Sequence, residues 1–184
     1  MNKEELEHGY DEQEDEELEG KSHSWIKLLI IIVLLISLLL FGIFFYMRSL
    51  VASRQVDSKN SKAKTCIKAL NAYFEDLTDK DGFEIPAGKE YIVKGYTDSE
   101  AMHIEPCELL KKGGICRYWS DSKIYWAVRV KNGKASEAWT YKDPITGDMM
   151  RYYSKSEQIG QYKKHLSDKV VGYYNSDEGD RYSH

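Results

Sequence analysis

The sequence predicts an α+β protein in which one long N-terminal helix packs on a small antiparallel sheet, with a further helix near the C-terminus. Residues 25–47 form an unbroken apolar run, and residues 56–77 carry an apolar stripe at helical spacing. An Asn132-Gly133 pair separates two runs rich in β-forming residues, as in a tight hairpin. The predicted parts are a tail (1–24), a transmembrane helix (25–47), an amphipathic helix that continues it (48–78), and the antiparallel-sheet domain with its C-terminal helix (79–184).

The first segment, residues 1–24, is strongly acidic. Its ten acidic residues outnumber Lys3 and Lys21, so its net charge is −8, and Tyr10 is its single aromatic residue. Such a segment cannot bury enough apolar surface to offset the entropy lost on ordering, so we expect a disordered tail. It is either a solvated terminus or a docking site for a basic partner.

Residues 25–47 are 23 consecutive positions with one charge, Lys27. As a helix they would be roughly 34 Å long, enough to cross a hydrocarbon core of about 30 Å. Trp25 at one end and Phe44 and Tyr46 at the other are typical interfacial aromatic residues. A cleaved signal peptide would have a shorter apolar region and a basic leader, so we predict a retained single span.

Two signals disagree about the orientation of this span. Six Lys and Arg residues follow it closely and three lie at or before its start, so the positive-inside rule places the following domain in the cytoplasm. Long domains, however, translocate largely regardless of charge. We therefore expect a protein of the cell membrane with a cytoplasmic N-terminus and an extracytoplasmic C-terminal domain.

The cysteines give a weak second indication of compartment. Cys107 and Cys116 flank a turn-rich loop, CELLKKGGIC, that would suit a disulfide in an oxidising environment. Two free thiols fit the same spacing equally well. Cys66 lies in the amphipathic helix and is expected to be buried. The cysteines form no CxxC pair and have no histidine at ligand spacing, so we expect no metal site.

The amphipathic helix follows from an apolar stripe with steps of 7, 4, 3, 4 and 3 residues. Its members are Val56, Ala63, Ile67, Leu70, Phe74 and Leu77. The stretch TDKDG at residues 78–82 is a helix stop. Because no proline interrupts residues 47–78, we expect one nearly continuous helix from about 25 to 78.

Short strands and one helix are expected in the remainder. The strand predictions are 90–93, 116–120, 124–130 and 135–141, with the last three forming a meander. A helical turn is expected near 105–111. Ser154 and Glu157 have the spacing of a capping box, and they open a helix whose stripe is Ile159, Tyr162, Leu166 and Val170.

No catalytic or cofactor-binding pattern occurs in the sequence. The five histidines lack acidic partners at motif spacing, and no nucleophile–base set is visible, so we expect no enzyme and no cofactor. Residues 48–184 hold 23 basic and 20 acidic residues, too weak an excess for nucleic-acid binding. The aromatic residues serve core packing, or else Trp126 and Trp139 form a face for cell-wall sugar.

The order of these parts resembles that of type IV pilins and type II secretion pseudopilins of bacteria. The similar stretches are KAKTCIKALNAYFEDL, the helix end NAYFEDLTDKDG, the hairpin YWAVRVKNGKASEAW and the closing VVGYY. The family's processing motif is absent: Ser22, His23 and Lys27 stand where family members have Gly, Phe and Glu.

The resemblance implies a subunit or accessory component of a pilus or secretion assembly, with other pilin-like subunits and the membrane as partners. Assembly would use the stalk, through the apolar positions Ile30, Leu34, Leu38 and Ile43 and the stripe positions Ile67, Leu70 and Phe74. A membrane-tethered extracellular binding module for cell-wall carbohydrate or a protein partner is the alternative. The positive-inside count keeps a cytoplasmic adaptor open as a third reading.

Overall fold

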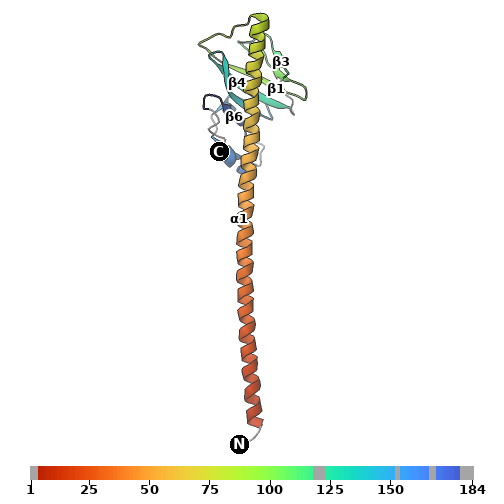
Figure 1. Cartoon of the computed structure of the whole chain (residues 1–184), viewed down its shortest axis with the longest axis vertical. Helices are drawn as coiled ribbons and strands as arrows, with labels where there is room; N and C mark the ends of the chain where they lie inside the picture. The colour runs from red at the N-terminus through yellow and green to blue at the C-terminus, as the bar shows by residue number, and fades with distance from the viewer. Residues whose placement is uncertain (1–3, 118–122, 152–153, 166–168, 179–184) are drawn as a thin grey trace. The chain divides into compact units, whose positions relative to one another are not determined.

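The computed structural model describes residues 4–117, 123–151, 154–165 and 169–178 (Figure 1). The chain divides into two compact units, Met1–Arg48 and Ser49–His184. The predicted α+β class is confirmed. The elements in chain order are α1 (Glu4–Asp81), β1 (Glu90–Thr97), β2 (Met102–Ile104), β3 (Gly114–Cys116), β4 (Ile124–Lys131), β5 (Lys134–Tyr141), the 3-10 helix η1 (Gly147–Met150), α2 (Lys155–His165) and β6 (Gly172–Asn175).

Helix α1 begins at Glu4, well before the expected residue 25. Glutamate, a good helix former, dominates this segment, which contains no proline. Negative charge near a helix N-terminus also interacts favourably with the helix dipole. The sequence interpretation gave more weight to composition than to these local preferences.

The strands form one antiparallel sheet in the order β3-β2-β1-β4-β5-β6. The three eight-residue strands, β1, β4 and β5, occupy its centre. The predicted β4–β5 hairpin is confirmed, because Asn132 and Gly133 have φ values of 50° and 81°. Both residues of a type I′ turn need positive φ, which Asn and Gly tolerate best.

The outer strands differ from the sequence prediction. The strand expected at 116–120 beside β4 is instead β3, which ends at Cys116 and lies at the far edge next to β2. Residues 118–120 lie outside the described residues. Strand β1 takes the place beside β4, while β2 and β6 were not predicted. Residues 105–111 form an irregular loop rather than a helical turn, closed by the Cys107 N–H donating to the Leu110 carbonyl at 2.9 Å.

One face of the sheet packs on the later part of α1 (Figure 1). The predicted stripe supplies the helix side of this core: Ile67 is 5% exposed, Leu70 0% and Phe74 3%. Trp126 and Val128 belong to the same core from the sheet side. Gly82, with φ 62°, ends the helix near the predicted stop, and its N–H donates to the Thr78 carbonyl.

The other face of the sheet carries a second, smaller core. Trp139 and Tyr173 pack there with their ring centroids 5.7 Å apart, and Ile145 from the segment after β5 covers them. Neighbouring residues of β4 point to opposite faces, so Trp126 contributes to the first core and Ala127 to the second. The sheet is therefore covered on both faces.

A buried polar network attaches the C-terminal elements to α1. Gln158 of α2 is 1% exposed, and its amide exchanges two hydrogen bonds with the Asn60 amide, at 3.1 and 2.9 Å. Gln158 Nε2 also donates to the Val171 carbonyl at 2.7 Å, and the Tyr173 N–H donates to Asn60 Oδ1 at 2.9 Å. The predicted capping box of α2 is confirmed: the Glu157 N–H donates to Ser154 Oγ, and the Ser154 N–H donates to Glu157 Oε2.

The predicted stripe of α2 is only partly realised. Gln158 is the buried residue of this helix, whereas Ile159 and Tyr162 are half-buried. Val170 is fully buried after the helix, and Leu166 lies outside the described residues. An amide that finds three hydrogen-bond partners can replace an apolar side chain at a buried position.

Candidate functional site

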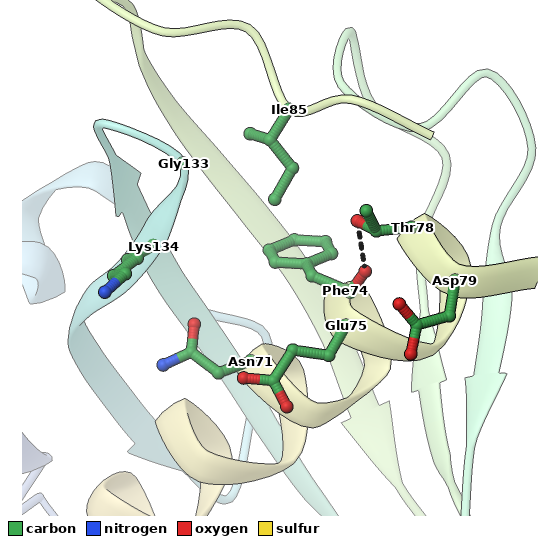
Figure 2. A pocket seen from close by; sticks show the side chains of 8 residues that line it. All are labelled: Asn71, Phe74, Glu75, Thr78, Asp79, Ile85, Gly133 and Lys134. Carbon is green, nitrogen blue, oxygen red and sulfur yellow. Dashed lines mark hydrogen bonds between the residues drawn. The ribbon is translucent and has the colours of Figure 1, made fainter. Parts of the chain in front are cut away.

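A hollow of about 470 Å³ lies between the end of α1 and the β4–β5 turn, and we call it the α1 groove (Figure 2). Figure 2 shows the Phe74 ring and Ile85 facing each other, while the Glu75 and Asp79 carboxylates come from successive turns of α1. The groove therefore combines an apolar floor with charged side chains at its rim. Its lining residues are Asn71, Phe74, Glu75, Thr78, Asp79, Ile85, Gly133 and Lys134.

Hydrogen bonds from α1 fix the walls of the groove. Asn71 Oδ1 accepts the N–H of Ala135 at 2.9 Å, which holds the start of β5 against the helix. Thr78 Oγ1 lies 2.9 Å from the Phe74 carbonyl and 3.0 Å from the Phe83 carbonyl, so its single proton is shared between the two (Figure 2). The groove is therefore built on ordered elements.

A second hollow of about 430 Å³ adjoins the first, and both are lined by Asn71 and Lys134. Lys131, Ser136 and Asp177 are among its other lining residues. Neither lining contains histidine or cysteine among the described residues. The two hollows can hold a ligand with apolar and charged parts.

The apolar positions predicted for assembly fall into two groups. Ile30, Leu34, Leu38 and Ile43 are exposed, with 53%, 57%, 68% and 53% of their surfaces accessible. Helix α1 is long and apolar enough there to cross a membrane, judged by length and composition, and its most apolar window has no buried residue. The stripe positions Ile67, Leu70 and Phe74 are instead buried in the core of their own domain.

Trp126 and Trp139 serve core packing, the first of the two roles considered for them. Trp126 and Trp139 are each 1% exposed and belong to cores on opposite faces of the sheet, so they cannot present a common surface. Trp139 is covered by the Arg129 guanidinium 5.6 Å from its ring, and its Nε1 donates to the Arg151 carbonyl.

The two loop cysteines are not bridged. Cys107 and Cys116 are free, which rejects the disulfide alternative and leaves the free-thiol one. The Cys116 thiol is buried and donates to the Ala69 carbonyl of α1 at 3.4 Å, while Cys107 is half-buried. Cys66 is buried as expected, and burial raises the pKa of its thiol far above the ordinary value, with the nearby Cys116 adding to the shift.

Acidic residues and histidines do not converge on a metal site within the described part of the chain. His103 Nε2 lies within hydrogen-bonding distance of Asp98 Oδ2. Asp98 also accepts the backbone N–H groups of Ala101 and Glu100. These bonds lower the pKa of Asp98 to about 2, with the largest effect from Ala101, followed by Glu100 and His103. The carboxylate therefore stabilises the turn between β1 and β2.

Comparison of this chain with protein-family models, with curated proteins and with solved structures gave no match. The site is therefore defined by its own geometry. Sequence reasoning missed the α1 groove because its walls come from residues about 60 positions apart, Asn71 and Lys134. The Asn-Gly turn and the end of the apolar stripe each marked one wall, but no local signal placed them side by side.

Proposed function

We propose that this chain is a single-span membrane protein whose C-terminal α+β domain lies outside the cytoplasm and belongs to a pilus-type or secretion-type assembly. The supporting observation is the difference between the two halves of α1. The stripe beyond residue 49 is buried under its own sheet, whereas every apolar side chain of residues 25–47 is exposed. Lipid or neighbouring copies must cover that surface, because water does not solvate such an area favourably.

The assembly would therefore be held by the apolar helix alone. Ile30, Leu34 and Leu38 are four residues apart and share one helix face, where neighbouring helices can pack closely. The stripe at Ile67 and Leu70 stabilises the domain and is unavailable to other subunits.

Disulfide cross-linking of the full chain in native membranes tests this proposal. We expect Leu34→Cys and Leu38→Cys, in a Cys107→Ser background, to give cross-linked dimers on mild oxidation. Ile32→Cys and Ile36→Cys are matched controls on the opposite helix face and should cross-link far less. A uniform monomer for all four variants would reject assembly through the span.

The α1 groove supports a second candidate function, a membrane-tethered binding module for cell-wall carbohydrate or a protein partner. Its apolar floor and its charged rim are the usual features of a small-ligand site. Sedimentation of the full chain with purified cell-wall material would test the carbohydrate form of this function. Loss of sedimentation in Glu75→Ala and Lys134→Ala would support it, and equal sedimentation of the wild type and both variants would reject it.

A further inference from the structure

Four lysines surround a small cavity at one end of the sheet, which we call the lysine pocket. They are Lys59, Lys62, Lys123 and Lys142, and the other lining residues are Ile124, Thr140, Tyr141 and Val170. The cavity has a volume of about 210 Å³. This pocket is distinct from the α1 groove, with which it shares no lining residue.

The fold brings these four lysines together from three separate elements. Lys59 and Lys62 are one turn apart on α1 and therefore share a face. Lys123 directly precedes β4, and Lys142 directly follows β5. The antiparallel register pairs Tyr125 with Tyr141, so the start of β4 and the end of β5 lie at the same edge of the hairpin.

Specific contacts hold Lys59 and Lys123. Lys59 Nζ donates to the Val170 carbonyl at 3.1 Å, and the Lys59 carbonyl accepts the Thr140 hydroxyl at 3.3 Å. The Lys123 ammonium lies 5.9 Å from the ring centroid of Tyr96 and 5.8 Å from that of Tyr125. Ammonium groups that are already positioned lose less conformational entropy when they bind an anion.

We propose that the lysine pocket binds a phosphate group. Its described lining brings four ammonium groups to one cavity. Lysine binds phosphate oxygens as a point charge with up to three donors, and the Thr140 and Tyr141 hydroxyls add polar surface. The cavity is smaller than the roughly 300–1,000 Å³ typical of sites for larger organic ligands, which favours a compact anion.

The phosphate has two chemical sources, a free phosphate ion and a phospholipid headgroup. Eleven residues separate Lys59 from Met47, the end of the apolar run, and this short connection limits how far the pocket can lie from a bilayer that holds the run. The headgroup source therefore rests on the proposed membrane span. Binding of free phosphate does not depend on it.

Titration calorimetry on the full chain in micelles of an uncharged detergent tests the proposal, with inorganic phosphate as the probe and chloride keeping the ionic strength constant. The double variant Lys62→Gln/Lys142→Gln should weaken phosphate binding by at least about tenfold, since it removes two of the four charges. Lys111→Gln/Lys112→Gln, which removes the same charge from an exposed loop, should leave the affinity within about twofold. Near-ultraviolet circular dichroism checks that both variants fold.

A charge-preserving variant, Lys62→Arg/Lys142→Arg, separates anion binding from a structural role of these side chains. It should retain phosphate binding within a few-fold, because arginine also binds phosphate. Equal weakening in the pocket variant and the loop variant would overturn the proposal, because binding would then follow net charge alone. Loss of binding in the arginine variant, with the fold intact, would equally overturn it.

A second experiment identifies the source. The full chain is placed in phosphatidylcholine nanodiscs with or without phosphatidylglycerol, and its unfolding temperature is measured. Phosphatidylglycerol should raise this temperature in the wild type and not in Lys62→Gln/Lys142→Gln if the ligand is a headgroup. An effect of inorganic phosphate alone identifies a free anion, and no effect of either compound overturns the proposal. These outcomes do not depend on assembly through the span, so a monomer in the cross-linking experiment above would not change them.

Discussion

Replacing Gln158 by leucine should destabilise the folded domain strongly, although the position is fully buried. Leucine has a similar size, so the main change is the loss of three hydrogen bonds, two with the Asn60 amide and one to the Val171 carbonyl. The Val171 carbonyl then remains in a buried site without this donor. Asn60 Oδ1 keeps the bond from the Tyr173 N–H, so the damage on that side is confined to the amide Nδ2.

The expected magnitude follows from these losses. A buried polar group left without a partner costs about 1–3 kcal/mol, and the half-buried Asn60 amide should cost less because water can reach it. Leucine adds some favourable apolar burial. We expect a net loss of about 3 kcal/mol in the free energy of unfolding, which lowers the unfolding midpoint by roughly 10 °C for a unit of this size.

The matched control is Gln161→Leu, the same substitution one turn later in α2. The Gln161 Oε1 atom is buried and has no hydrogen-bond partner among the described residues. Its removal should be neutral or slightly stabilising. The measurement is thermal unfolding of the full chain in micelles, followed by near-ultraviolet circular dichroism. If Gln158→Leu costs less than about 1 kcal/mol, or no more than Gln161→Leu, the assigned role of the network is wrong.

Three further predictions concern the sheet, the β1–β2 turn and the thiols. Gly95→Ala should lower the free energy of unfolding in urea by about 3 kcal/mol, because a Cβ atom there would overlap a backbone carbonyl of β2. The control Gly160→Ala meets no atom and should stabilise α2 by roughly 0.5–1 kcal/mol. Similar unfolding midpoints for the two variants would refute the close packing of β1 on β2 at Gly95. Asp98 has a pKa lowered to about 2, below its ordinary value of 3.8, so its contribution to the stability of the fold is present above pH 3.8 and is lost as the pH falls toward 2. Asp98→Asn should remove this part of the acid sensitivity. An unfolding midpoint with the same pH dependence in the variant and the wild type would contradict this role of Asp98. Cys107 should react with a membrane-impermeant maleimide in intact cells, while the two buried thiols react only after unfolding; labelling that requires lysis would place the domain in the cytoplasm.

Local signals in the sequence were sufficient for those elements that depend on neighbours in the chain. The Asn132-Gly133 turn needs only two residues that tolerate positive φ, and the Ser154–Glu157 capping box spans one helical turn. The buried stripe around Leu70 follows from helical spacing alone. Each of these features was predicted correctly because the physics that fixes it lies within a few residues.

Features that depend on distant residues were missed. The edge strands β2, β3 and β6 are short, and their pairing is decided by the rest of the sheet rather than by their own composition. The sequence left a common face for Trp126 and Trp139 open, because their opposite orientations depend on a bulge-containing register. Both the α1 groove and the lysine pocket join α1 to the hairpin, so no single stretch of sequence contains either site.

The Asn60–Gln158 network also constrains when this domain can fold during synthesis. The partners are 98 residues apart, and the Tyr173 bond to Asn60 spans 113 residues. Helix α1 therefore emerges from the ribosome long before the strands that cover its stripe, and the last contacts form only when β6 is complete. Until the strands that cover them are synthesised, Leu70 and Phe74 lack their core partners on a nascent chain that carries a second apolar segment upstream. Chains truncated before residue 170 should accordingly depend on chaperones and be degraded rapidly, because their contacts of highest sequence separation cannot form.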